Sequence, residues 1–219
     1  MGWGIGWGLL IVAIVVALVT YVIVQEMRAQ QHWRRLVEQG DLDAIRQIVQ
    51  GEVKRWREDR PPRDVPPSLW HGVQTVELLE IGGDYVRLTC TAEGQYAMVD
   101  GQRREVSTAL SEGMKLTAKL ADMFLYDIPN LRLDRVQIDV YTTFRDRRGA
   151  ATQDCILSTL VRRSDAQYVD WEASSPEEIV AIFGGRFRRD QSGAALPIEP
   201  DAESVRVGPS EPQSPHSEA

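Results

Sequence analysis

Hydrophobic residues are continuous near the start of the chain and become periodic after it. An apolar run from Leu9 to Ile23 is broken only by Thr20, and the first charged side chain is Glu26. A helix needs about 20 mainly apolar residues to cross the hydrocarbon layer of a bilayer. We therefore expect residues 2–25 to contact the lipid bilayer as a single-pass transmembrane helix. No basic residue precedes the run and no small-residue cleavage site follows it, so we expect an uncleaved signal-anchor rather than a cleaved signal peptide.

Apolar positions then recur every three to four residues as far as residue 60, which is typical of amphipathic helices. Gly40 can end one helix and Asp41 can cap the next, so residues 26–60 are predicted to form a helical hairpin or stalk. Two proline pairs follow within residues 61–68. Proline disfavours helix and favours extended backbone, which predicts a semi-rigid linker before the folded domain.

From Val73 the apolar spacing changes to two, which is typical of half-buried β-strands. A second hairpin is expected to close at Asp100–Gly101, because both central positions of such a turn favour positive φ. A third hairpin is expected to place Arg145 opposite Ala150. The predicted strands are residues 76–78 with a return over 86–92, 96–99 with 102–106, 136–145 with 150–161, and a short strand at 168–171.

Two helices are expected between these strands. Ser107 or Thr108 can cap a long helix that continues to about Tyr126, and Ser174 or Ser175 can cap a shorter one that ends at Gly184–Gly185. The charged residues of the long helix recur at intervals of three and four, so they form a single stripe that we expect to face solvent. This stripe contains Glu112, Lys115, Lys119 and Asp122.

Runs of strands interrupted by single helices, without regular β-α-β alternation, indicate an α+β fold in which helices pack on one face of an antiparallel sheet. The last residues are rich in Ser, Pro and Glu and poor in large apolar groups, which predicts disorder. The expected division is a transmembrane anchor at 1–25, a juxtamembrane stalk at 26–60, a linker at 61–68, the α+β domain at 69–188 and a disordered tail at 189–219.

Charge gives the anchor an orientation. Arg28, Arg34 and Arg35 follow the apolar run, and basic residues beside a span tend to stay on the cytoplasmic side. We therefore expect the N-terminus outside and the domain in the cytoplasm. A net charge of −7 without a clustered basic face gives no argument for a nucleic-acid partner. Gly4 and Gly8 have the spacing of a helix-helix contact, so a homodimer is possible but not otherwise supported.

Candidate chemistry is sparse, and the sequence predicts no catalytic residue, no cofactor-binding residue and no metal ligand. Cys90 and Cys155 alternate with apolar residues, which predicts inert core thiols. The best alternative is a hard-cation site from Asp139, Tyr141 and Asp154 on the outer face of the third hairpin, although carboxylates on a strand surface are usually solvated. A weak basic patch is also conceivable from Arg162, Arg163, Arg186, Arg188 and Arg189.

Three functional classes stay open. The first is a non-catalytic interaction or accessory module, held at the cytoplasmic membrane face near a protein partner. The second is a membrane-tethered enzyme or small-ligand domain, which a pocket with converging polar groups would favour. The third is a cell-envelope domain that faces outward.

Overall fold

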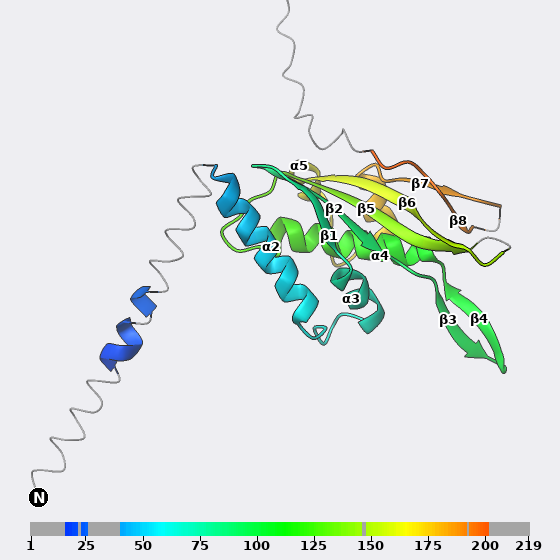
Figure 1. The fold of residues 1–219 in the computed structure, drawn as a ribbon, viewed down its shortest axis with the longest axis horizontal. Helices are drawn as coiled ribbons and strands as arrows, with labels where there is room; N and C mark the ends of the chain where they lie inside the picture. The colour runs from blue at the N-terminus through cyan, green and yellow to red at the C-terminus, as the bar shows by residue number, and fades with distance from the viewer. Residues whose placement is uncertain (1–15, 22, 26–39, 146–147, 192, 202–219) are drawn as a thin grey trace, which may run out of the picture.

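A computed structural model describes residues 16–21, 23–25, 40–145, 148–191 and 193–201, and shows an α+β domain built on a mixed sheet (Figure 1). The six strands of this sheet lie in the order β1-β2-β5-β6-β7-β8, and a separate two-stranded ribbon contains β3 and β4. The strands are β1 (Glu77–Ile81), β2 (Tyr85–Thr91), β3 (Gln95–Val99), β4 (Gln102–Ser107), β5 (Arg135–Arg145), β6 (Ala151–Arg162), β7 (Arg186–Arg189) and β8 (Ala195–Leu196). The helices are α2 (Leu42–Glu58), α3 (Pro67–Gln74), α4 (Ala109–Asp122), a π-helical turn η1 (Met123–Asp127), α5 (Arg163–Ala166) and α6 (Pro176–Ile182).

The expected antiparallel sheet is confirmed in part, because β2 and β5 pair in parallel. The other strand pairs of the sheet are antiparallel. Parallel neighbours require a crossover of a dozen or more residues, usually with a helix. The chain between β2 and β5 supplies that crossover in α4, and it also carries the β3–β4 ribbon.

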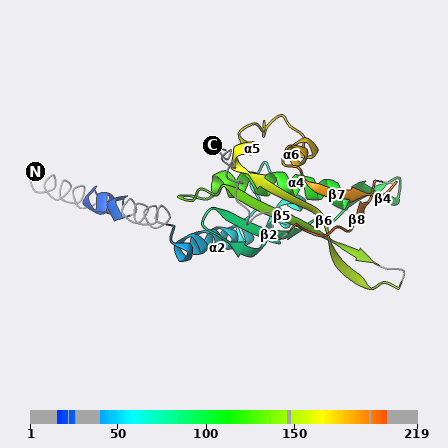
Figure 2. The same cartoon turned by 90° about the horizontal axis from the view of Figure 1, so that it is seen from above.

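Helix α4 covers one face of the sheet. A side chain placed on Gly113 would lie 3.2 Å from Val140 of β5 and 3.8 Å from Ile156 of β6, so glycine lets α4 approach the strands closely. Figure 2 shows α4 and α6 on the same side of β5 and β6. Thr108 caps α4 by accepting the N–H of Ser111 at 3.2 Å, which confirms one of the two predicted caps.

Helix α2, which the sequence analysis assigned to a stalk, packs into the domain. Its buried face includes Ile45, Val49 and Val53, and the ring of Trp56 meets Phe124 edge-on at 5.2 Å between centroids. The same hydrophobic core includes residues of β2, α4 and β5. An amphipathic helix buries its apolar stripe wherever a complementary surface exists, and here the domain provides that surface. The core therefore continues on both sides of the proline segment.

The C-terminal end of the expected linker forms a helix rather than extended backbone. Pro67 occupies the first turn of α3, where its missing N–H costs no helical hydrogen bond, so the expected extended backbone is wrong from this residue onward. Trp70 of α3 donates its indole N–H to the Asp59 carbonyl at 3.1 Å. That bond holds α3 against the end of α2.

Several local predictions are confirmed. In β2, burial alternates strictly along the strand. Asp100 and Gly101 adopt φ values of 53° and 75°, as the predicted hairpin turn requires. Ser175 and Glu178 form a complete capping box at the start of α6.

Other local predictions are wrong. Residues 168–171 form turns and irregular backbone rather than a strand, and Arg145 pairs with Ala151 instead of Ala150. The segment predicted to be a disordered tail contains β8, and beyond it Ile198 donates its N–H to the Cys155 carbonyl at 2.8 Å. Residues 202–219 lie outside the described part of the chain.

The expected anchor lies mostly outside the described residues, which include only 16–21 and 23–25 of it, both helical. Among the described residues, none of the helices combines the length and the apolar character that a membrane crossing requires.

Candidate functional site

The β3–β4 ribbon, residues 95–107, extends away from the body of the domain, and we call it the arm (Figure 1). Every residue of β3 after Gln95 is exposed, as is every residue of β4 before Ser107. Large apolar side chains are exposed among them: Tyr96 by 53%, Met98 by 70% and Val106 by 57%. Four exposed large hydrophobic residues, including Val99, therefore lie on one short ribbon, whereas those elsewhere in the domain are scattered.

The arm has a regular register. Ala97 lies opposite Arg104 and Met98 opposite Arg103, and the only irregularity falls between Gln95 and Tyr96, at the base. The guanidinium of Arg103 stacks over the Tyr96 ring at 4.3 Å from its centroid. Tyr96 and Met98 share one face of the ribbon, because side chains two residues apart point the same way. A two-stranded ribbon is only marginally stable by itself, so this arm depends on what holds its base.

Glu112 of α4 holds that base. Its carboxylate accepts hydrogen bonds from Gln95 Nε2 at 2.7 Å and from Ser107 Oγ at 2.5 Å. Gln95 begins β3 and Ser107 ends β4, so one carboxylate ties both strands to the helix. Lys115 adds an ion pair with the same carboxylate at 2.7 Å. The expectation that the charged stripe of α4 simply faces solvent is wrong for Glu112, which is 7% exposed.

The three donors also fix the charge of Glu112. Burial alone raises the pKa of its carboxyl group, because the charged form loses hydration. The hydrogen bonds from Lys115, Ser107 and Gln95, together with the charge of Lys115, outweigh that effect and bring the pKa below its ordinary value. Glu112 is therefore ionised at neutral pH and accepts all three bonds at once.

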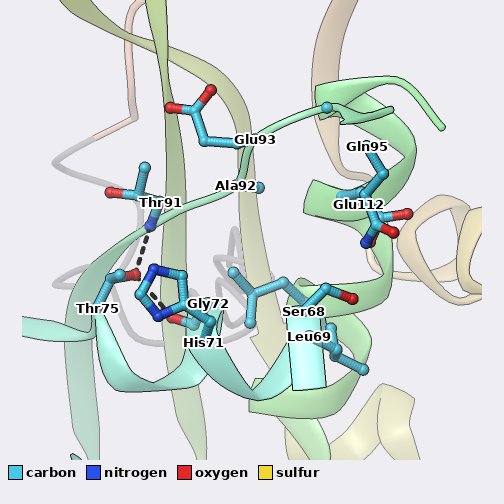
Figure 3. Close-up of a pocket in the computed structure, with 12 residues that line it drawn as sticks. Ser68, Leu69, His71, Gly72, Thr75, Thr91, Ala92, Glu93, Gln95 and Glu112 are labelled. Carbon is cyan, nitrogen blue, oxygen red and sulfur yellow. Dashed lines mark hydrogen bonds between the residues drawn. The ribbon is translucent and has the colours of Figure 1, made fainter. Parts of the chain in front are cut away.

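A cleft of about 240 Å³ lies beside the base of the arm, between α3, α4 and the end of β2 (Figure 3). Thr75 and Thr91 lie at one end of the cleft, and Gln95 and Glu112 lie at the other. Leu69 and Leu116 contribute apolar surface to the lining. The remaining lining residues are Ser68, His71, Gly72, Ala92, Glu93 and Gly94.

Several polar groups of this cleft are bonded within the domain. Thr75 Oγ1 donates to the Gly72 carbonyl at 2.7 Å and accepts the Thr91 N–H at 2.9 Å. The Glu112 carboxylate is occupied by its three donors. The cleft is also smaller than the roughly 300–1,000 Å³ usual for small-molecule sites. These features indicate that the cleft is part of the surface that positions the arm and not a pocket that binds a ligand.

The residues proposed for a cation site do not form one. Asp139 is fully buried rather than solvated, and its carboxylate accepts from Arg87 Nη2 at 2.8 Å and from Ser158 Oγ at 2.7 Å. Gln137 completes this buried network by donating to Asp139 Oδ1 at 3.0 Å. A carboxylate at this depth requires such partners, because an unpaired charge is costly to bury.

Asp154 lies four positions before Ser158 on β6, opposite Thr142, and accepts from Thr152 Oγ1 at 3.0 Å. Tyr141 pairs with Cys155 instead of Asp154 and lines a separate polar groove of about 530 Å³. Burial raises the pKa of its hydroxyl above the ordinary value. Within the described ranges there is no group of three or more His, Cys, Asp and Glu side chains able to hold a metal ion.

Most arginines of the suggested basic patch bind to other groups of the same domain. Four of its five arginines make ion pairs or hydrogen bonds within the chain. The contacts are Arg162 with Asp165 at 3.9 Å, Arg163 with the carbonyls of Leu133 and Leu125, Arg186 with Asp201 at 3.4 Å and Arg189 with Glu177 at 2.6 Å.

Both cysteines are buried and free, in agreement with the predicted core thiols. Burial, reinforced by the charge of Asp139, raises the pKa of both thiols, and that of Cys155 reaches about 12. Because the thiolate is the reactive form, these side chains are unreactive in the folded protein.

Comparisons of the chain with protein-family models, with curated proteins and with solved structures gave no match. Function is therefore inferred from the arm and its base.

Sequence reasoning identified the arm's turn but missed its exposure. The stretch Tyr96–Val99 lacks the alternation of apolar and polar residues seen in β2, and that difference was the available signal. A strand that packs one face on a core alternates, whereas one that projects from the domain need not. Glu112 carried no comparable signal, because only the folded chain brings Gln95 and Ser107 to it.

Proposed function

We propose that this protein is a membrane-tethered, non-catalytic interaction module whose arm is the element that contacts a protein partner. The observation that carries the proposal is the group of exposed apolar side chains on the arm, which is fixed to the domain through Glu112. Monomeric surfaces rarely gather large apolar groups on one projecting element, and such groups mark interaction sites.

The tether rests on the sequence of residues 2–25 and on the exposure of their described part. Val16, Leu18 and Tyr21 are 58%, 59% and 62% exposed, so the domain does not cover these apolar side chains. A helix with apolar residues all round requires an apolar environment, which a bilayer provides. The arginines that follow favour the cytoplasmic side for the domain.

The arm and the start of α2 lie at opposite ends of the domain in both views (Figures 1 and 2). A chain that enters the domain at α2 from the membrane leaves the arm at the far end. Tethering also confines the arm to a thin layer near the membrane, where its effective concentration toward another membrane-associated protein rises. Ligand binding is a weaker alternative, because the cleft at the base is small and several of its polar groups are bonded within the domain.

The test is site-specific photo-crosslinking in cells that express the full chain. A photoreactive amino acid at Met98 should form adducts on irradiation, because this side chain is 70% exposed on the arm. The matched control is Tyr168, which is 78% exposed on the body of the domain. Adducts from Met98 that clearly exceed those from Tyr168 support the proposal, and equal yields contradict it.

Orientation is tested separately. C-terminal fusions to a reporter that fluoresces only in the cytoplasm, and to one that is active only after export, should give a signal from the first alone. Activity of the exported reporter would place the domain outside and would favour the cell-envelope alternative.

A further inference from the structure

We propose that the partner of the arm is the arm of a second copy of this chain, joined through the open edges of the two β3 strands in an antiparallel pair centred on Ala97. This inference rests on the proposed function, because it identifies the partner of the same arm. The resulting sheet would have the order β4-β3-β3-β4 across the two copies.

The open edge of β3 lacks the features that usually prevent strands from pairing. Residues 95–99 contain no charged residue and no proline, and β3 itself has no inserted residue. Exposed edges are normally protected by charges, proline or bulges. Strand β1, one of the two edges of the main sheet, has such protection, because it carries Glu77 and Glu80 and an irregularity in its pairing. The arm is thus the edge most suited to adding a strand.

Backbone geometry selects the centre of the pair. Val99 and Gln102 close a two-residue loop, so they form a hydrogen-bonded pair and the polar groups of Val99 point toward β4. Because successive residues alternate, the N–H and C=O groups of Tyr96 and Met98 point to the open edge. An antiparallel pair centred on Ala97 places Tyr96 opposite Met98 of the second copy, and each such pair exchanges two backbone hydrogen bonds.

Side chains are compatible with this register. Tyr96 and Met98 lie on one face, so the two copies would form a four-residue apolar cluster in which each sulfur meets an aromatic ring. The open edge of β4 carries Arg103, Arg104 and Glu105, and charged residues of this kind normally protect an exposed edge from pairing. Strand β3, which has no charged residue, is therefore the less protected edge of the arm.

Antiparallel pairing also sends the tip of one arm toward the base of the other. Asp100 and Gly101 of the second copy would lie beyond Gln95, toward Glu93 and Gly94, which line the cleft of about 240 Å³.

Pairing changes a marginal ribbon into a four-stranded sheet, which is more stable than two strands alone. The contact is small compared with the roughly 1,200–2,000 Å² of standard interfaces, so its affinity in dilute solution is low. Confinement of both copies to one membrane raises their effective concentration and favours the pair.

The decisive experiment is disulfide trapping of the full chain in isolated membranes, with copper phenanthroline and oxygen as the oxidant. In the proposed pair the two Ala97 Cα atoms lie about 4.5 Å apart, inside the range of about 4.4–6.8 Å that a disulfide spans. The A97C variant should therefore form a covalent dimer rapidly. The native thiols add little background, because both are buried.

R104C is the matched control, because Arg104 lies directly opposite Ala97 on β4 and both side chains are exposed. In the proposed sheet the two Arg104 positions are about 14 Å apart, three strand spacings, which excludes a disulfide. We expect the A97C dimer to form at least tenfold faster than the R104C dimer. Similar rates for the two variants would indicate random collision and would overturn the proposal.

A charge exchange tests the register. In the A97C background, Y96K or M98E alone should reduce trapping several-fold, because each places a charge opposite an apolar residue of the second copy. The combined Y96K and M98E variant places opposite charges face to face and should recover most of the trapping. Both sites are exposed, so folding is not at risk. Absence of recovery would contradict this register.

Photo-crosslinking at Met98 separates failure of the inference from failure of the proposed function. Adducts with the mass of two chains support both. Adducts of another mass, combined with equal A97C and R104C trapping, would overturn the second-copy proposal and leave the arm as a contact for a different protein. Absence of Met98 adducts above the control would overturn both.

Discussion

Substitution of Glu112 by alanine tests whether one carboxylate holds the arm to the domain. The change removes the acceptor of Gln95 and Ser107, the residues at the two ends of the ribbon. Hydrogen bonds to charged groups contribute about 1.5–3 kcal/mol each. The lower value applies here, because the neighbouring cleft lets water replace the lost acceptor, so the two bonds together contribute about 3 kcal/mol. Lys115 is 44% exposed and adds little.

This free energy belongs to local opening of the arm and only in part to global unfolding. About 3 kcal/mol corresponds to an increase of roughly a hundredfold in the population of the open arm. Hydrogen-deuterium exchange of the full chain should therefore show protection of residues 95–107 reduced by about that factor, with much smaller changes in β5 and β6.

The control is Asp122→Ala, which removes an i,i+3 pair with Lys119 from the same helix and should change exchange in the arm by less than about twofold. Exchange in the arm that stays the same in Glu112→Ala, while β5 and β6 lose protection, would refute the idea that Glu112 acts on the arm.

Acid should imitate this substitution in the unmodified protein. The folded-state pKa of Glu112 lies below its ordinary value, so its stabilising effect is present above the unfolded-state pKa. That effect is lost as the pH falls through the folded-state pKa. Exchange rates corrected for their intrinsic pH dependence should therefore rise in the arm below about pH 4, and Glu112→Ala should lack this rise.

Two further predictions concern the domain that carries the arm. Asp139→Ala should destabilise the domain by about 3–5 kcal/mol in urea unfolding, because Arg87 is left buried without its partner. Replacing Arg87 by Met and Asp139 by Leu together should lower the free energy of unfolding by less. An equal loss in the two variants would contradict the assigned pair. Gly185→Ala should lower the thermal midpoint at a cost of about 1–3 kcal/mol, because the new Cβ would lie 2.3 Å from a Val180 methyl and 3.1 Å from its carbonyl oxygen. Gly51→Ala, with nothing within 4 Å of the new Cβ, should instead raise the midpoint.

Local features of the fold could be predicted because neighbouring residues determine them. The Asp100–Gly101 turn follows from the positive φ that both positions accept, and the start of α6 follows from the spacing of Ser175 and Glu178. The alternating burial of β2 follows from its period of two. In each case the interacting groups lie within a few residues of one another.

The depth of polar side chains could not be predicted in this way. Asp139 occupies the alternating position of an outward-facing residue, yet it is buried because Arg87 of β2 and Ser158 of β6 surround it. The parallel pairing of β2 with β5 brings Arg87 near Asp139, and this pairing connects segments about fifty residues apart. No local pattern contains that information.

The sequence by itself thus determined the class of the domain, most of its strands and helices, and the turn at the tip of the arm, because period and turn chemistry act over short distances. Only the tertiary structure decided that α2 packs into the core, that Glu112 clamps Gln95 and Ser107, and that the arm projects with its apolar side chains exposed. The physical reason is that burial depends on which distant segments cover a residue. The arm is exposed because the six-stranded sheet closes its core without it.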